Sequence, residues 1–65
     1  MKTCDRAWLS KKREDKKLTQ SQVAEKVSIS QQMFSYIENG ILNPSVKTAK
    51  KIAEVLEFEW TRFYE

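Results

Sequence analysis

Residues 18–40 read LTQSQVAEKVSISQQMFSYIENG, and this stretch decides the fold of the 65-residue chain. Thr19 begins a T-x-x-Q capping box that ends at Gln22, a pattern typical of a helix start. The apolar residues that follow recur at helical spacing and form one stripe: Val23, Ala24 and Val27. The stretch therefore opens with a predicted helix of about nine residues.

A second helix is predicted after the very short turn at Ser28 and Ile29. Ser30 is a favourable N-cap residue, because its hydroxyl can accept a hydrogen bond from the first turn of the helix. Gly40 is the only glycine of the chain, so it enters the left-handed conformation at the least cost. The second helix is therefore expected to stop at Asn39.

The residues before this stretch predict one further helix. It runs from about Asp5 to Lys16, with Asp5 or Thr3 as its cap and with Trp8 and Leu9 facing inward. The charged run KKREDKK at its end is interpreted as a solvated face.

The residues after the stretch predict two more helices. Ser45, which follows Asn43 and Pro44, caps the first of them, and its apolar residues are assigned to the core: Val46, Ala49, Ile52, Ala53 and Leu56. The last segment, FEWTRFYE, holds four of the seven aromatic residues. A short fifth helix there folds its aromatic side chains back as a lid. Burial is expected for Phe58 and Phe63, whereas Trp60 and Tyr64 belong either to the core or to a dimer surface.

Length and composition fit one small domain over residues 1–65. A chain this short buries only about 60% of its unfolded surface, which leaves no room for a second domain. One glycine and one proline leave few places for the tight turns of a β-sheet, so an all-α, compact five-helix fold is expected. The single cysteine, Cys4, forms no disulfide within the chain and is interpreted as an N-terminal thiol without a partner. No signal peptide and no apolar run of about 18 residues is present, so a cytoplasmic protein is expected.

The charge is uneven along the chain. Residues 1–33 hold eight Lys and Arg against four Asp and Glu, a balance of +4, whereas residues 34–65 hold four against five, a balance of −1. A basic half of this kind suits a polyanion such as a DNA duplex, although solvated helices carry similar imbalances.

A helical wheel of residues 31–39 gives the more specific signal. With Gln31 at 0° and about 100° per residue, Phe34 and Ile37 mark the buried side. An uncharged polar arc spans roughly 0° to 140°, and it is made of Gln31, Ser35, Asn39, Gln32 and Tyr36. Solvated helix faces usually carry Lys and Glu, whereas amides and hydroxyls suit hydrogen bonds to base edges, as in the bidentate pairing of glutamine with adenine. A carboxylate at this place would repel the phosphates beside the groove.

Two short helices with a tight turn and such a face describe a helix-turn-helix. The chain resembles the lambda-repressor and Cro-like family of bacterial and phage regulators, the xenobiotic-response-element type. The resemblance runs from Leu9 nearly to the chain end, including IAEVL, and its motif residues are Leu18, Thr19, Gln20, Val23, Ala24, Val27, Ile29, Ser30, Phe34, Ser35, Ile37, Glu38, Gly40, Asn43, Pro44 and Ser45.

The resemblance implies a domain whose third helix enters the major groove of double-stranded DNA. Gln31, Gln32, Ser35 and Tyr36 then face the bases. Gln20 is similar to the phosphate-anchoring glutamine of the family, which acts with the start of its helix. Three further residues are implied as backbone contacts, although each also has a structural explanation as a cap, a residue before glycine or a turn former: Ser30, Asn39 and Asn43.

Two positions depart from the family pattern, and two others form a pair. Ser28 and Glu57 stand where the family usually has glycine, so Ser28 is expected either at positive φ, at roughly 1 kcal/mol, or in a slightly different turn. Glu57 leaves the end of the fourth helix in doubt. Arg13 and Glu38 match a family pair and are expected to form an ion pair between the first and third helices; the alternative is that both are solvated.

Other functional classes are less well supported. The chain has no histidine, no paired-cysteine metal spacing and no glycine-rich phosphate loop, so no enzyme, cofactor or metal site is expected. Met33 is assigned to packing against the second helix. The serious alternative is a protein-binding module, such as an antitoxin or adaptor, that uses the aromatic C-terminal segment.

Regulation is expected to work by occupancy of DNA. One domain reads about half a site, so a homodimer on a palindromic operator is expected, with the fifth helix as its interface through Trp60, Arg62 and Tyr64. Phage-type repressors, restriction-modification controllers and conjugative-element regulators all resemble this chain.

Overall fold

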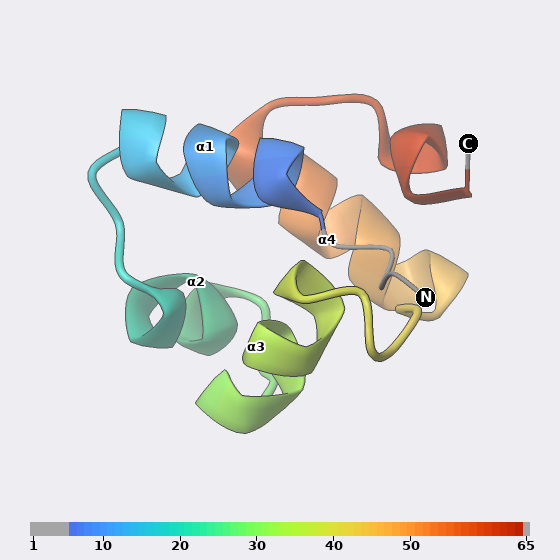
Figure 1. Ribbon diagram of the computed structural model, residues 1–65, viewed down its shortest axis with the longest axis horizontal. Coiled ribbons are helices and arrows are strands. Elements are labelled where there is room, and N and C mark those ends of the chain that lie inside the picture. Colours follow the sequence, from blue (N-terminus) through green and yellow to red (C-terminus); the bar gives the residue numbers. More distant parts are fainter. Residues whose placement is uncertain (1–5, 65) are drawn as a thin grey trace.

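The computed structural model describes residues 6–64. These residues form four α-helices and one 3-10 helix, with no strand among them. In chain order the elements are α1 (Ala7–Asp15), α2 (Gln20–Lys26), α3 (Gln31–Glu38), α4 (Val46–Leu56) and the 3-10 helix η1 (Trp60–Tyr64). In Figure 1, α1 lies along one side of the molecule, α2 and α3 lie along the opposite side, and α4 extends from behind α1 to the right of α3. The expected all-α class is confirmed.

Three of the helices begin where the capping residues predict. The hydroxyl of Thr19 accepts a hydrogen bond from the backbone N–H of Gln22, and the Gln22 side chain accepts one from the backbone N–H of Thr19. The hydroxyls of Ser30 and Ser45 likewise accept hydrogen bonds in the first turns of α3 and α4. These contacts satisfy backbone donors that have no partner within a helix.

The start of α1 differs from the expected one. The helix begins at Ala7 and not at Asp5, because the backbone N–H of Arg6 donates to the carbonyl of Glu38 in α3 at 3.0 Å. Arg6 fills the N-cap position without a side-chain capping bond. The expected caps Thr3 and Asp5 lie outside the described residues, as does Cys4.

The core is a cluster of buried apolar side chains, and each of the five helices contributes to it. Leu9, Phe34 and Ile37 are fully buried, and they share this interior with the predicted stripes of α2 and α4: Val23, Ala24, Val27, Ala49, Ile52 and Leu56. Ala53 is also buried, and Trp8 and Met33 pack against the cluster while remaining partly exposed. Val46 was expected in the core, but it is 48% exposed. As the first residue of α4 it lies at the helix end, where the stripe has passed the edge of the core.

The C-terminal lid forms, although not as an α-helix. η1 is only five residues long and closes with the backbone N–H of Arg62 on the carbonyl of Glu59, a short-range pattern typical of 3-10 turns. Phe63 is buried, and its ring lies 5.5 Å from Phe58 and 5.6 Å from Trp8, centroid to centroid. Burial of Phe63 is as expected. Phe58 was also expected to be buried, but it packs against the core and remains partly exposed.

Among residues 6–64, three residues other than glycine are left-handed. Ser28 has φ 62°, Glu57 has φ 60° and Lys17 has φ 58°. The positive φ at Ser28 agrees with the first of the two expected alternatives, and Glu57 ends α4 in the conformation that glycine usually supplies. Lys17, in the connection from α1 to α2, was not anticipated, because lysine carries no sequence signal for this conformation.

Candidate nucleic-acid interface

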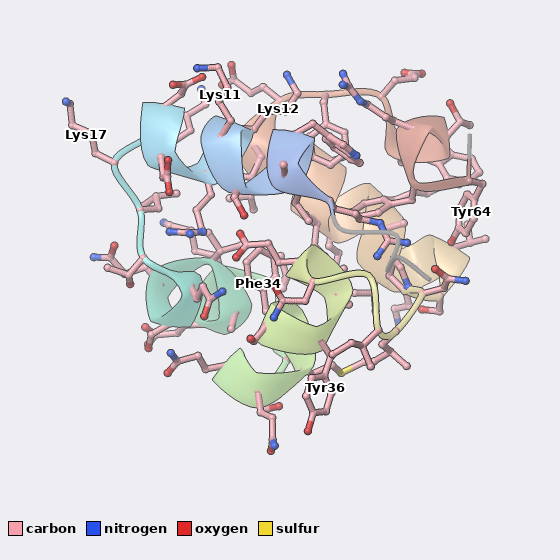
Figure 2. All side chains as sticks on the ribbon, in the orientation of Figure 1. Lys11, Lys12, Lys17, Phe34, Tyr36 and Tyr64 are labelled. Carbon is pink, nitrogen blue, oxygen red and sulfur yellow. The ribbon has the colours of Figure 1, made fainter. Side chains whose placement is uncertain are left out.

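The outer face of α3 carries the uncharged side chains that the helical wheel grouped together. Gln31, Gln32 and Asn39 are exposed, Ser35 is partly exposed, and Tyr36 keeps 40% of its surface open. Figure 2 shows Phe34 directed into the molecule and Tyr36 directed outward from α3, on the side away from α1. We call these five outward residues the α3 polar face. The structure thus places five of the eight candidate residues together on one surface.

Hydrogen bonds within the α3 polar face connect residues one turn apart. The Gln32 Nε2 donates to the Tyr36 hydroxyl at 2.9 Å, and the Asn39 Nδ2 donates to the Ser35 hydroxyl at 3.4 Å. After its bond to Tyr36, Gln32 retains one amide hydrogen and its Oε1. Those two groups are the donor and acceptor that match N7 and N6 of adenine.

Ser30 lies at the start of this face and is engaged there. Its hydroxyl oxygen accepts a hydrogen bond from the Met33 N–H at 3.0 Å. The hydroxyl proton is not used by that bond, so the same side chain can donate to an anion while it caps the helix. Structural and binding roles are therefore compatible at this residue.

Glu38, beside the α3 polar face on the helical wheel, is buried, and only 3% of its surface is exposed. Its Oε2 accepts from the Arg13 Nε at 2.8 Å, and Arg13 also donates to the carbonyl of Leu18 at 2.9 Å. The expected ion pair between α1 and α3 is therefore confirmed. Because the pair is largely removed from solvent, loss of either member would leave the other as an uncompensated buried charge.

Gln20 joins this buried group, which was not predicted. At the start of α2, its Nε2 donates to the Glu38 Oε1 at 2.5 Å. The second amide hydrogen and the Oε1 of Gln20 remain for another partner. Gln20 is thus held by a carboxylate of α3 at the junction of α1, α2 and α3.

Asn43 lies in the loop between α3 and α4 and is exposed. Its Oδ1 accepts a hydrogen bond from the Arg6 Nη2 at 2.6 Å. Arg6 is itself buried, with 7% of its surface exposed. The expected roles of Asn39 and Asn43 as residues around the turn are both compatible with the observed positions.

Comparison with known proteins agrees with this geometry. Residues 9–63 match the helix-turn-helix protein family. The chain belongs to that family, in its lambda-repressor and Cro-like form. It is 47% identical over 60 residues to the uncharacterized HTH-type transcriptional regulator YqaF of Bacillus subtilis (strain 168), an alignment that covers 92% of this chain and 79% of that protein. No solved structure matches the chain at a significant level.

The helix-turn-helix itself is the α2–α3 pair with the turn at residues 27–30. The backbone N–H of Ile29 donates to the carbonyl of Ala24 at 2.9 Å, and Ser28 takes the left-handed conformation beside it. This short connection packs α2 against α3 and leaves the α3 polar face outward.

Part of the positive charge of this helix-turn-helix domain lies on α1, away from the α3 polar face. Figure 2 shows Lys11 and Lys12 projecting from α1 on the side of the molecule opposite Tyr36. The basic N-terminal half therefore does not place these two lysines beside the α3 polar face.

Arg6 lies near this site, and the sequence-based predictions did not include it. An arginine just before a helix is a poor partner for the positive end of the helix dipole, and this mismatch is the one signal that it serves another element. The hydrogen bonds of its guanidinium with Ile37, Leu42 and Asn43 span 31 to 37 positions of the sequence, and no local pattern encodes them.

Within residues 6–64, no group of three or more potential metal-ligating Cys, Asp or Glu side chains is present. None of the helices in the same range combines the length and apolar character that a membrane crossing requires.

Proposed function

We propose that this helix-turn-helix protein is a sequence-specific, double-stranded DNA-binding transcriptional regulator that reads the major groove with α3. The observation that carries the proposal is the α3 polar face, which is exposed and holds no charged side chain. Amides and hydroxyls in such a row can exchange hydrogen bonds with base edges without repelling the flanking phosphates. The 47% identity to a protein named as a transcriptional regulator supports the same class.

The contacts divide into two groups. Gln31, Gln32, Ser35 and Tyr36 read bases, with Gln32 suited to adenine through its remaining amide hydrogen and oxygen. Phosphate contacts come from the residues around this face: Gln20, Ser30, Asn39 and Asn43. In this arrangement, the second amide hydrogen of Gln20 reaches a phosphate while the first holds Glu38.

We further propose that the protein acts in the cytoplasm as a repressor of the phage or mobile-element type, bound as a homodimer to a palindromic operator. One α3 covers only part of a site, and two-fold related copies place two such helices in successive turns of the groove. The η1 surface supports this dimer, because Tyr64 keeps 47% of its surface exposed while its hydroxyl anchors the segment to the Pro44 carbonyl at 2.7 Å.

Selection of bound duplexes from a random pool, followed by titration at several salt concentrations, tests the proposal. A DNA reader enriches one sequence and loses affinity steeply as salt rises. The proposal would be contradicted if the bound duplexes shared no common sequence, or if the affinity did not change with salt concentration.

A second candidate function is a protein-binding module such as an antitoxin or adaptor. Exposed apolar side chains near the loop after α3 favour it, since Ile41 is 65% exposed and Val46 is 48% exposed. The same selection separates the two functions, because a module that binds only protein enriches no duplex.

A further inference from the structure

The Arg6 guanidinium donates hydrogen bonds to the end of α3 and to the loop that follows it. Its Nη1 donates to the carbonyl of Ile37 at 2.6 Å and to that of Leu42 at 3.3 Å. The Nη2 donates to the Asn43 Oδ1 at 2.6 Å, and the guanidinium carbon lies 5.4 Å from the centroid of the Phe63 ring. A positive charge at the carbonyl end of a helix is favourable, and the fork of the guanidinium spans the helix and the following loop together.

We propose that Arg6 is a positioning residue for DNA binding, which orients and polarises the side-chain amide of Asn43 so that its Nδ2 donates to a phosphate. This inference rests on the proposed function, and it adds a residue outside the helix-turn-helix to the binding machinery. The ligand is a phosphate of the duplex backbone beside the place where α3 ends.

The orientation of the Asn43 amide follows from hydrogen-bond chemistry. A guanidinium has only donors, so the group of Asn43 that faces it must be the oxygen. The Nδ2 is therefore directed to the other side of the amide. No hydrogen bond among residues 6–64 uses this Nδ2, and the side chain is exposed, so both of its hydrogens are available to a ligand from solvent.

The charge of Arg6 reaches the ligand through this amide. A hydrogen bond from a cation to the oxygen of an amide makes the N–H groups of that amide stronger donors, because bonds in a chain polarise one another. A buried guanidinium cannot touch DNA directly. It can, however, strengthen the exposed donor in front of it, on a loop that extends toward the same side of the molecule as α3 and away from α1 (Figure 1).

A double-mutant cycle in DNA affinity tests the proposal, using the selected duplex and the variants Arg6→Lys and Asn43→Ala. Lysine keeps the charge and loses the fork. We expect each single variant to weaken binding by about three- to tenfold, the range of one hydrogen bond. In the Asn43→Ala background, Arg6→Lys should weaken binding by less than about twofold, because the group it acts through is absent.

Asn39→Ala provides the matched control for this cycle. Asn39 is another exposed amide at the end of α3, and its side chain bonds Ser35 and not Arg6. The losses from Asn39→Ala and Arg6→Lys should therefore multiply. If the losses from Asn43→Ala and Arg6→Lys also multiply, Arg6 acts only on the fold and the proposal is overturned.

Two further outcomes have defined meanings. Failure of the wild-type chain to prefer any duplex removes the proposed function and this inference with it, whereas preference with an uncoupled cycle removes the inference alone. If Arg6→Lys does not fold, the side-chain amide resonance of Asn43 in the wild-type protein decides: it should shift when the selected duplex is added, and an unchanged resonance contradicts the proposal.

Discussion

At the scale of single residues, the two glutamines of the α3 polar face and Gln20 have different surroundings and should have different roles. Gln31 and Gln32 are exposed, whereas Gln20 is tied to Glu38. We expect Gln31→Ala and Gln32→Ala each to lose about 1 to 3 kcal/mol of binding free energy and to relax preference at particular bases. Gln20→Ala should weaken binding to all sequences alike, since a phosphate carries no sequence information.

Affinities for the selected duplex and for single-base variants of it separate these roles. Unfolding should be followed in parallel for Gln20→Ala, because this substitution also removes a donor from a buried carboxylate. Equal losses on every duplex for all three variants would remove the division between base reading and phosphate contact.

A second prediction at this scale concerns the buried carboxylate of Glu38. Glu38→Gln keeps the shape of the side chain but leaves the Arg13 guanidinium without its charged partner at 2.8 Å. Removing one member of a buried ion pair costs about 3 kcal/mol, so the free energy of unfolding in urea should fall by about that amount. DNA affinity should fall as well, because glutamine has one acceptor oxygen where Glu38 has two, and the contacts with Arg13 and Gln20 each use one of them.

Glu14→Gln is the control for this prediction. Glu14 lies 3.9 Å from the same guanidinium, but its side chain is 68% exposed. Its replacement should change stability by less than about 0.5 kcal/mol. A Glu38→Gln protein as stable as the wild type, with unchanged affinity, would show that the pair does not position α3.

At the scale of the elements, glycine substitutions at the left-handed residues that end helices should stabilise the protein. Ser28 has φ 62° in the turn between α2 and α3. Glycine adopts this conformation without the steric cost, so Ser28→Gly should raise the free energy of unfolding by about 0.5 to 1 kcal/mol. Urea denaturation measures the change, and a decrease in stability would indicate that the serine side chain supports the turn.

Glycine can also replace the left-handed residue Glu57, and the effect of this substitution on the free energy of unfolding should depend on pH. A hydrogen bond and ion pair with Lys16, at 2.8 Å, lower the pKa of Glu57 from its ordinary 4.5. A lowered pKa contributes stability that is present above about pH 4.5 and is lost as pH falls through the folded-state pKa. Glu57→Gly removes the steric cost of the left-handed backbone and also removes the contribution of the ion pair. The free energy of unfolding of the variant should therefore exceed that of the wild type by more at about pH 3 than at about pH 7. A gain that does not change with pH would contradict the role of the ion pair.

The limits of the sequence-based predictions also lie at this scale. Caps at Thr19, Ser30 and Ser45 could be predicted because each acts within its own first turn. The outward direction of the α3 polar face followed from the period of the helix. Contacts of Gln20 with Glu38, and of Arg6 with Asn43, join residues 18 and 37 positions apart, and local pattern does not encode them. The prediction of Val46 as a core residue was wrong, because the apolar stripe of a helix does not show where along the helix the core ends.

At the scale of the whole molecule, the distribution of charge predicts how salt acts on binding. The two lysines Lys11 and Lys12 project away from the α3 polar face (Figure 2). The double variant with Lys11→Gln and Lys12→Gln should therefore change the slope of log affinity against log salt by less than about one unit. A fall of about two units would mean that DNA contacts α1, and that the face identified on α3 is not the principal one.

The last prediction at this scale concerns assembly on DNA. Arg62 lies on η1 with its guanidinium 4.5 Å from the centroid of the Trp8 ring, and it remains exposed. If η1 forms the two-fold interface, Arg62→Glu reverses the charge at this position on both chains and removes the cation that packs on the Trp8 ring, because a two-fold interface contains each residue twice. Binding to a palindrome with half-sites about 10 base pairs apart should lose its cooperativity, while binding to a single half-site stays unchanged.

Sedimentation of the protein with each duplex measures the number of bound chains, and titration measures the affinity. The half-site is the internal control, since a variant that unfolds or repels DNA generally loses affinity on both duplexes. A wild-type chain that saturates the palindrome with one copy, or an Arg62→Glu variant equally weakened on both, would place the interface elsewhere than η1. The half-site result would still leave the reading of bases by α3 standing, because that role depends on one chain alone.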